Sequence, residues 1–250
     1  MRWWKRSWTV GFVGVLACSG AQAQEGQPVV PGDGRLDTSR LAEFDAIYDQ
    51  MGFEMRVRFR REPDDAGWSF SMEMANPTGT AIDHIGHGPD LDFRYRRFAF
   101  GAYRDEFLDV RATGDSIVLG RLPRDDESAV PRRASEAVSE PVLDGTFMYW
   151  ALGLLDEDGP TSFRVWGPTS ESLEIRETAS LRRVDDSDVE LPDGSMVTAR
   201  VFEAVTGSGR LRMIVSREAP YLIRQELVSE DGSVTPIIEL GGLGPVGGAR

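Results

Sequence analysis

Lysine, cysteine and histidine are almost missing from this 250-residue chain, in which Lys5 is the only lysine, Cys18 the only cysteine, and His84 and His87 the only histidines. Lys5 and Cys18 both precede a predicted cleavage site after Ala23, so the processed chain would contain neither. Their absence would exclude lysine Schiff-base chemistry and a phosphate-loop lysine. It would also exclude a thiol nucleophile, a disulfide and a cysteine-built zinc site.

Positive charge is scarce as well. The chain has 28 basic and 41 acidic residues, and its formal net charge is −13. On net charge alone, nucleic acid and an anionic lipid surface are poor partners. The hydrophobic content of 40% is ordinary for a soluble globular protein, and the length allows one sizeable core.

The amino terminus has the three parts of a cleavable export signal over residues 1–23. Arg2, Lys5 and Arg6 precede an apolar run over residues 8–17, and Ala21-Gln22-Ala23 supplies the small residues of a cleavage site. The apolar run is about half of the ~20 residues that span a bilayer. We therefore expect a periplasmic protein whose mature chain has no transmembrane helix.

A second interpretation of this segment involves lipidation. Residues 15–20, Val-Leu-Ala-Cys-Ser-Gly, resemble the lipobox of bacterial lipoproteins, in which the cysteine becomes the lipidated first residue. Cys18 would then anchor an outer-membrane lipoprotein. The A-x-A fit favours cleavage after Ala23, and the lipoprotein is the alternative.

The remaining chain predicts a β-rich domain over residues 36–240, between a Pro/Gly-rich flexible linker at 24–35 and a flexible tail at 241–250. Apolar residues recur at helical spacing in 38–51, where Ser39 can cap a short helix. A second short helix is expected over 145–155, capped by Asp144 and apolar on most sides, hence buried. A core strand is the alternative for so short an apolar run.

Elsewhere the apolar period is two. Met55, Val57 and Phe59 alternate with arginines, which is typical of antiparallel strands with one dry face. Further strands are expected over 68–74, 93–103, 107–112, 117–119, 172–184, 189–191, 196–205, 211–217, 221–228 and 235–240, with a loop over 123–141. These patterns predict a mainly β fold: a single curved antiparallel sheet, or half-barrel, wrapped around the two short helices.

Several short pieces resemble an uncharacterised family of exported bacterial domains of unknown function, which is similar in organisation to the half-barrel carriers that sort lipoproteins. They are Leu36-Asp37, Val142-Leu143-Asp144-Gly145, Leu191-Pro192-Asp193-Gly194-Ser195, Pro220 to Leu227, and Asp231-Gly232. The resemblance implies a curved sheet around helices and an envelope location. It carries over no catalytic residues and no cofactor.

His84 and His87 are weak candidates for a metal site. Two imidazoles three residues apart can share a metal if Gly86 and Gly88 bend the chain, whereas a regular strand would send them to opposite faces. Asp90 and Asp92 lie nearby, but the H-E-x-x-H pattern and a third histidine are missing, so a loop pair without metal is the simpler interpretation. The acidic run 185–190 could offer oxygen ligands to calcium, but it lacks the EF-hand glycine and distal glutamate, and a solvated turn is the favoured interpretation.

A set of large apolar side chains is the more informative feature. If the sheet curls incompletely, these side chains line a concave apolar surface, and methionine-rich walls adapt to flexible acyl chains. The alternative is that the two helices fill the concavity and leave an ordinary core. The candidate ligand-binding residues are Trp68, Phe70, Met72, Met74, Phe98, Phe100, Met213 and Tyr221.

The sequence therefore favours a non-enzymatic exported protein that binds an apolar ligand or the acyl chain of a lipoprotein. An envelope assembly scaffold without a ligand is the first alternative. A metal-dependent hydrolase centred on His84 and His87 is the second.

Overall fold

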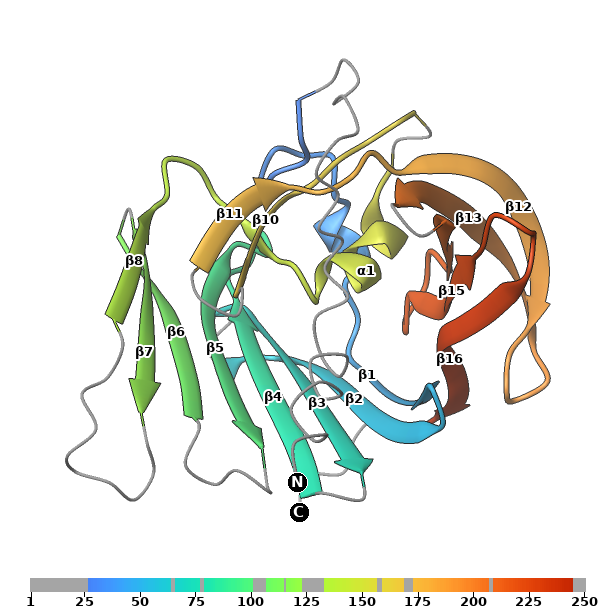
Figure 1. Ribbon diagram of the computed structural model, residues 1–250, viewed down its shortest axis with the longest axis horizontal. Coiled ribbons are helices and arrows are strands. Elements are labelled where there is room, and N and C mark those ends of the chain that lie inside the picture. The colour runs from blue at the N-terminus through green and yellow to red at the C-terminus, as the bar shows by residue number, and fades with distance from the viewer. Residues whose placement is uncertain are drawn as a thin grey trace, which may run out of the picture.

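The structure, a computed structural model, describes residues 27–63, 66–76, 79–100, 107–114, 116–122, 133–156, 159–168, 173–206 and 209–244. Within these ranges the chain is mainly β. An antiparallel sheet of 13 strands curves around a short helical segment, and a three-stranded sheet lies near its open side (Figure 1). The prediction of a mainly β fold built on one curved antiparallel sheet is confirmed.

The large sheet has the strand order β12-β13-β14-β15-β16-β1-β2-β3-β4-β5-β6-β7-β8. In chain order its strands are β1 (Phe44–Gln50), β2 (Phe53–Arg61), β3 (Trp68–Asn76), β4 (Gly79–His87), β5 (Phe93–Phe100), β6 (Phe107–Thr113), β7 (Ser116–Leu122), β8 (Arg133–Ala137), β12 (Arg182–Glu190), β13 (Met196–Thr206), β14 (Gly209–Val215), β15 (Leu222–Val228) and β16 (Val234–Leu243).

The small sheet has the order β11-β10-β9, in which β10 pairs antiparallel with β11 and parallel with β9. Its strands are β9 (Leu143–Asp144), β10 (Arg164–Pro168) and β11 (Leu173–Glu177). The helical elements are η1 (Thr38–Arg40), α1 (Met148–Ala151) and η3 (Leu152–Leu154).

The alternating pattern of the sequence sets which face of each strand is buried. On β2, Val57 is fully buried while its neighbours Arg56 and Arg58 are exposed. Val57 pairs with Met72 on β3, which is also buried, because antiparallel register places inward residues opposite each other. The apolar residues of the strands therefore form one continuous inner face.

The turn between β1 and β2 shows why the chain can reverse so tightly. Gln50 pairs with Phe53, so Met51 and Gly52 form a two-residue loop, and their φ angles are 52° and 88°. Positive φ at both positions is the type I′ geometry that matches the twist of a hairpin, and glycine adopts it without steric cost.

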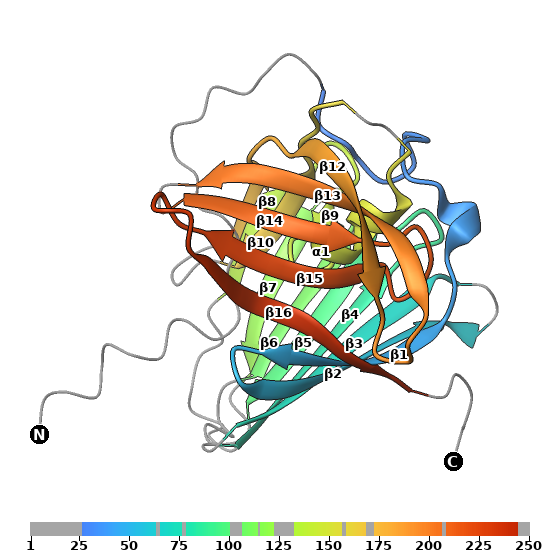
Figure 2. The ribbon, with the colours of Figure 1, turned by 90° about the vertical axis from the view of Figure 1, so that its right-hand side faces the viewer.

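The first and the last strand of the sheet in chain order are neighbours. β16 pairs antiparallel with β1 from Ala46–Leu243 to Gln50–Ile238, and Figure 2 shows the two strands side by side. This pairing joins the amino-terminal strands β1–β8 to the carboxy-terminal strands β12–β16. The two outermost strands of the described sheet, β12 and β8, do not pair with each other.

The helix predicted over 38–51 is wrong. Only Thr38–Arg40 form a helical turn, and its cap is Asp37, which accepts a hydrogen bond from the Ser39 N–H. Phe44–Gln50 form β1, whose alternate residues Phe44, Ala46 and Tyr48 are at most 3% exposed. These alternate residues are buried because the segment forms a strand between β16 and β2, where both of its edges are paired.

Other predicted boundaries also need correction. The strand predicted over 172–184 is divided between β11 and β12, and the loop predicted over 123–141 contains β8. The linker predicted at 24–35 is folded over its described part, since Val29 is fully buried and bridges Phe163. Residues 241–243, predicted as part of the tail, belong to β16, which runs to Leu243.

The predicted export signal and Cys18 lie outside the described residues. In the part of the chain that is described, no helix has the length and apolar character to cross a bilayer.

Candidate functional site

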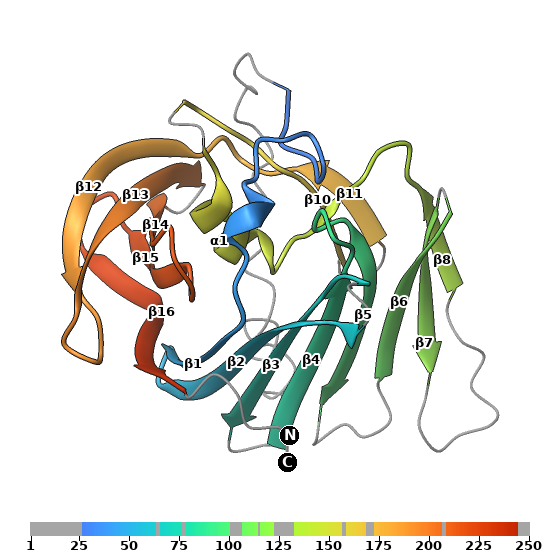
Figure 3. The same ribbon diagram turned by 180° about the vertical axis from the view of Figure 1, so that it is seen from behind.

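The concave side of the sheet holds residues 147–155, which we call the plug. It comprises Phe147, α1, η3 and Leu155, and all nine residues are buried. Figures 1 and 3 show α1 enclosed by the curve of the large sheet. The predicted buried helix over 145–155 is thus confirmed in its position and its burial, although it is shorter than expected.

Aromatic rings fix the plug to the inner face of the sheet. The Phe147 ring lies 5.5 Å from that of Phe59 on β2 and 5.2 Å from that of Phe70 on β3, measured between centroids. Trp150 lies 4.8 Å from Phe70 and 5.9 Å from Tyr48 on β1. Such pairs add about 0.5–1.5 kcal/mol each beyond their burial.

A hydrogen-bonded chain reinforces these ring contacts. The indole N–H of Trp150 donates to the Tyr48 hydroxyl at 3.1 Å, and that hydroxyl donates to the Leu222 carbonyl at 2.8 Å. Burial raises the pKa of Tyr48, so its hydroxyl keeps its proton and can donate. The plug is thereby connected to β1 and to the first residue of β15.

The start of the plug is held by a buried group of three charges. Asp144 caps it by accepting hydrogen bonds from the N–H groups of Thr146 at 2.8 Å and Phe147 at 3.2 Å. Its other carboxylate oxygen accepts from Arg96 Nη1 on β5 at 3.3 Å. Arg96 also donates from Nε and Nη2 to Asp83 on β4, at 3.0 and 2.5 Å.

Burial and mutual attraction act against each other in this group, whose side chains are 4% exposed for Arg96 and 0% for Asp83 and Asp144. Burial raises the pKa of Asp83 despite the neighbouring guanidinium. For Arg96, burial lowers the pKa but attraction to both carboxylates outweighs it, so the pKa is raised and the side chain stays charged. Every charge here has a partner, as buried charges require.

The end of the plug is held by two further arginines. Arg200 on β13, itself 3% exposed, donates to the carbonyls of Leu155 at 2.5 Å, Gly153 at 2.8 Å and Leu152 at 3.1 Å. Arg40 donates to the Leu154 carbonyl at 2.8 Å. These donors satisfy the last carbonyls of the helical segment, which have no partners within it.

His87 lies on the inner face next to the plug. It is fully buried, its ring centroid is 4.4 Å from that of Phe147, and neither ring nitrogen has a hydrogen-bond partner among the described residues. Burial lowers the pKa of His87 to about 3, so the imidazole is neutral in the folded protein near neutral pH.

The structure does not bring the two histidines together. His84 is exposed on the outer face of β4, whereas His87 is buried on its inner face, because the odd spacing of three along a strand reverses the direction of the side chain. Among the described residues, no group of three or more histidine, cysteine, aspartate or glutamate side chains has the arrangement of a metal site.

The predicted ligand-binding residues lie mostly inside the packed core. Trp68, Phe70, Met72, Met74, Met213 and Tyr221 are 8% exposed or less. Phe98 on β5 is half-buried. Phe100 is also on β5, but its side chain lies outside the described set.

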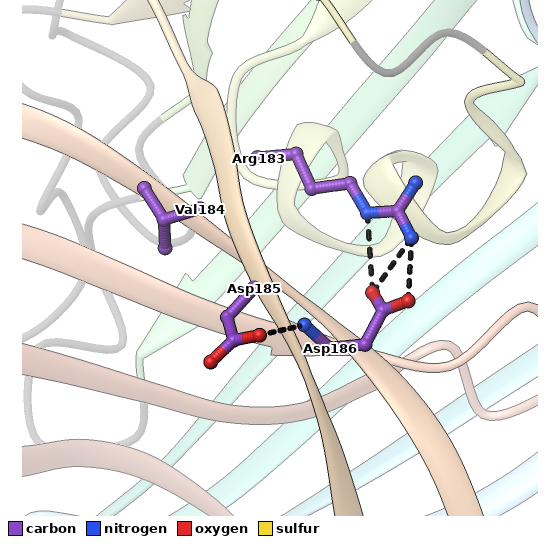
Figure 4. Close-up of a pocket in the computed structure, with 4 residues that line it drawn as sticks. All are labelled: Arg183, Val184, Asp185 and Asp186. Carbon is purple, nitrogen blue, oxygen red and sulfur yellow. Dashed lines mark hydrogen bonds and ion pairs between the residues drawn. The ribbon is translucent and has the colours of Figure 1, made fainter.

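The acidic run 185–190 forms part of β12 at the edge of the large sheet. Figure 4 shows a shallow surface recess lined by Arg183, Val184, Asp185 and Asp186. Arg183 binds both carboxylate oxygens of Asp186, at 2.7 and 2.6 Å, so this acid has a cationic partner within the chain. Asp188 accepts a hydrogen bond from the Thr198 hydroxyl at 2.8 Å.

Sequence reasoning missed the charges that hold the plug. Asp83, Arg96 and Arg200 occupy inward positions, where their strands otherwise carry mostly apolar side chains. Asp83, for example, lies between the inward-facing Ala81 and Ile85. A charged residue at an inward position of an amphipathic strand is the signal that could have identified them.

Comparison of the chain with protein-family models, with curated proteins and with solved structures gives no match. The resemblance to an exported domain of unknown function and to lipoprotein-sorting half-barrels therefore stays a prediction. The fold and the concave site rest on the structure alone.

Proposed function

We propose that this protein is an exported, non-enzymatic binding protein that holds an apolar ligand, or the acyl chain of a lipidated partner, on the concave face of its sheet. Three features support this proposal. The sheet is strongly curved, its inner face is mainly apolar, and its outermost described strands do not pair with each other.

The observation that carries the proposal is the extent of the inner face beyond the plug's ring contacts. Those contacts reach β1, β2, β3 and His87 at the end of β4. The inner face continues onto β5, β6 and β7 with Phe98, Val110 and Ile117. Phe98 is the half-buried member of this set, and it places an accessible aromatic surface next to buried aliphatic ones.

A ligand on this part of the sheet would be recognised chiefly by its apolar surface. Each methylene transferred from water contributes about 0.8 kcal/mol, so an acyl chain gains affinity in proportion to its buried length. Asp83 and Arg96 lie on the inner faces of β4 and β5 and are engaged with each other and, through Arg96, with Asp144, which leaves the apolar groups as the available contacts.

Native mass spectrometry of the processed protein, purified from its exporting host, tests the proposal. We expect an acyl-containing molecule to co-purify with the wild-type protein and to be lost from Phe98→Gln. The matched control is Ile82→Gln, which removes an apolar side chain that is 37% exposed on the outer face of the adjacent strand β4. Repeated purification of ligand-free wild-type protein would count against a carrier.

One observation favours an assembly scaffold as the second candidate. Six of the eight predicted ligand-binding side chains are 8% exposed or less, so this part of the concave face is occupied by the protein's own core. A scaffold would co-purify with a protein partner, and the same preparations would contain no bound lipid.

A further inference from the structure

Arginines on this acid-rich chain often have a carboxylate partner, and Arg58 and Arg97 on the outer face of the sheet are among those that depart from that pattern. Arg56 contacts Glu54 at 2.9 Å and Arg60 contacts Asp45 at 2.6 Å. In contrast, Arg58 approaches Asp45 only to 3.9 Å. Within the described residues Arg97 has no carboxylate within 4.0 Å, and its guanidinium lies 5.4 Å from the ring centre of Tyr95.

The register of the sheet places these two arginines in one row. Arg58 on β2 pairs with Ser71 on β3, Ser71 pairs with His84 on β4, and His84 pairs with Arg97 on β5. We call these four residues the arginine row. The strands that carry it are adjacent in the lower part of Figure 1. With neighbouring strands about 4.8 Å apart, the row is roughly 14 Å long.

The row is accessible to a partner. The side chain of Arg58 is 59% exposed, His84 and Arg97 are exposed, and Ser71 is half-buried. All four point away from the concave face, because Met72, Asp83 and Arg96 occupy the inward positions next to them on their strands. The row is therefore separate from the plug and from the apolar site proposed above.

The acids at the two ends of the row are already engaged. Asp45, on β1 beyond Arg58, is held by Arg60 at 2.6 Å. Asp109, on β6 opposite Arg97, is held by Arg111 at 3.0 Å. Glu73 on β3 is an outward acid two residues from Ser71, and the strand register places it opposite Arg56 rather than opposite a member of the row.

The net charge of −13 does not govern what this row can bind. Charges at an exposed surface are screened over about 8–10 Å at physiological salt, so the local groups dominate. The row has two arginines, a histidine and a hydroxyl, all of which can donate hydrogen bonds to phosphate oxygens. Its chemistry is thus complementary to phosphate although the whole chain is acidic.

The shape of the row narrows the choice of partner. Protein interfaces have apolar or aromatic centres from which charge is depleted, whereas the large exposed apolar side chains described on β2–β5 are two separate ones, Phe53 at the start of β2 and Ile82 on β4. A single phosphate ion is best held by donors that converge in a recess, whereas these donors are spread along a sheet face. A plane of phosphates fits that distribution.

We propose that the arginine row binds the phosphate groups of an anionic lipid surface. This contact would hold the outer face of β2–β5 against the membrane while the apolar concave face stays on the other side of the sheet. It is independent of the proposed ligand and can be tested without one.

Sedimentation of the processed protein with lipid vesicles tests this assignment. Vesicles of phosphatidylcholine mixed with phosphatidylglycerol are compared with vesicles of phosphatidylcholine alone. We expect binding only to the first kind, with a marked decrease as salt rises. A contribution of about 1 kcal/mol per arginine corresponds to about fivefold in affinity, so Arg58→Gln with Arg97→Gln should weaken binding about thirtyfold.

The matched control is Arg210→Gln with Arg212→Gln on β14. It removes the same charge from the outer face of the other half of the sheet, where both arginines contact Glu203. It should bind as the wild type does, and circular dichroism should show native sheet content for every variant.

Three results would overturn the assignment. The first is equal binding of the wild type to both kinds of vesicle, and the second is equal loss in the control. The third is displacement by inorganic phosphate at the same concentration as the lipid phosphate, which would identify a free-phosphate site instead. Loss of vesicle binding in a preparation that still co-purifies with an apolar ligand would separate this inference from the proposed function.

Discussion

Acid should destabilise the fold through His87. This imidazole is fully buried and has no hydrogen-bond partner in the part of the chain that the structure describes, and burial lowers its pKa from 6.5 to about 3. The unfolded chain therefore binds one more proton than the folded protein between these two pH values. The stability associated with the neutral ring is fully present above pH 6.5 and is lost progressively as the pH falls towards 3.

The magnitude follows from the size of the pKa shift. One pKa unit corresponds to 1.36 kcal/mol, so a fall from neutral pH to about pH 4.5 should remove about 3 kcal/mol from the free energy of unfolding. With a urea dependence of roughly 3 kcal/mol per molar, the unfolding midpoint should decrease by about 1 M. This loss is a large part of the 5–15 kcal/mol typical of a domain.

The assay is urea unfolding of the wild type, His87→Leu and His84→Leu at pH 7.5 and 4.5, followed by tryptophan fluorescence. Leucine fills a similar volume without a titrating group, so His87→Leu should lose about 3 kcal/mol less than the wild type between the two pH values. His84→Leu is the control because His84 is exposed on the same strand, and it should behave as the wild type does.

The comparison between variants isolates the imidazole from the carboxyl groups. Burial raises the pKa of Asp83, which has the opposite effect of increasing stability as the pH falls, but Asp83 is present in all three proteins. Equal pH dependence of the wild type and His87→Leu would refute the reasoning, because it would show that His87 is not buried as a neutral ring.

Three further substitutions test how the plug is held, each by the free energy of urea unfolding. Arg96→Met leaves Asp83 and Asp144 buried together without a cation and should lower the free energy of unfolding by about 3–5 kcal/mol. The control Arg111→Met changes a side chain that is 56% exposed and should lower it by at most about 1 kcal/mol. Equal losses for the two variants would contradict a buried triad. Gly153→Ala would place a Cβ 2.6 Å from the Ser216 carbonyl oxygen and from the Tyr221 Cβ, so we expect a loss of about 1–3 kcal/mol, while Gly159→Ala, with nothing within 4 Å, should be neutral. Tyr48→Phe removes the hydroxyl between Trp150 and Leu222 and should lower the free energy of unfolding by about 1–3 kcal/mol. This loss should exceed that of Tyr95→Phe, whose hydroxyl is half-buried. The reverse order would show that the plug does not depend on the hydrogen bonds of Tyr48.

The fold was largely predictable from the sequence because half-buried antiparallel strands impose a period of two on it. On β2 and β3 the inward residues are apolar and most outward residues are arginine, serine or glutamate, so both strands were predicted close to their observed bounds. β1 was missed because Leu41, Phe44, Tyr48 and Met51 also fit a helical period. Only its position between β16 and β2 favours the strand, and strand order is not a local property of the sequence.

The candidate site was less predictable because its contacts depend on register and topology. The apolar set was recognised as inward-facing, and most of it is buried. The sequence contains no direct sign that Arg96 on β5 would meet Asp144, 48 residues away. The arginine row was not predicted for the same reason. Each of its members lies 13 positions after the previous one in the chain, and they become neighbours only through pairing across four strands.

The pairing of β16 with β1 has a consequence for the order in which the molecule can be assembled. β1 has one edge that is complete only when Leu243 reaches Ala46, at the far end of the polypeptide. Contacts between such distant positions carry a large loop-closure entropy and slow the folding reaction. In a chain that emerges from its amino terminus, the facing edges of β1 and β15 therefore stay unpaired until β16 is available. A fragment lacking β16 would expose these two edges and be prone to aggregation.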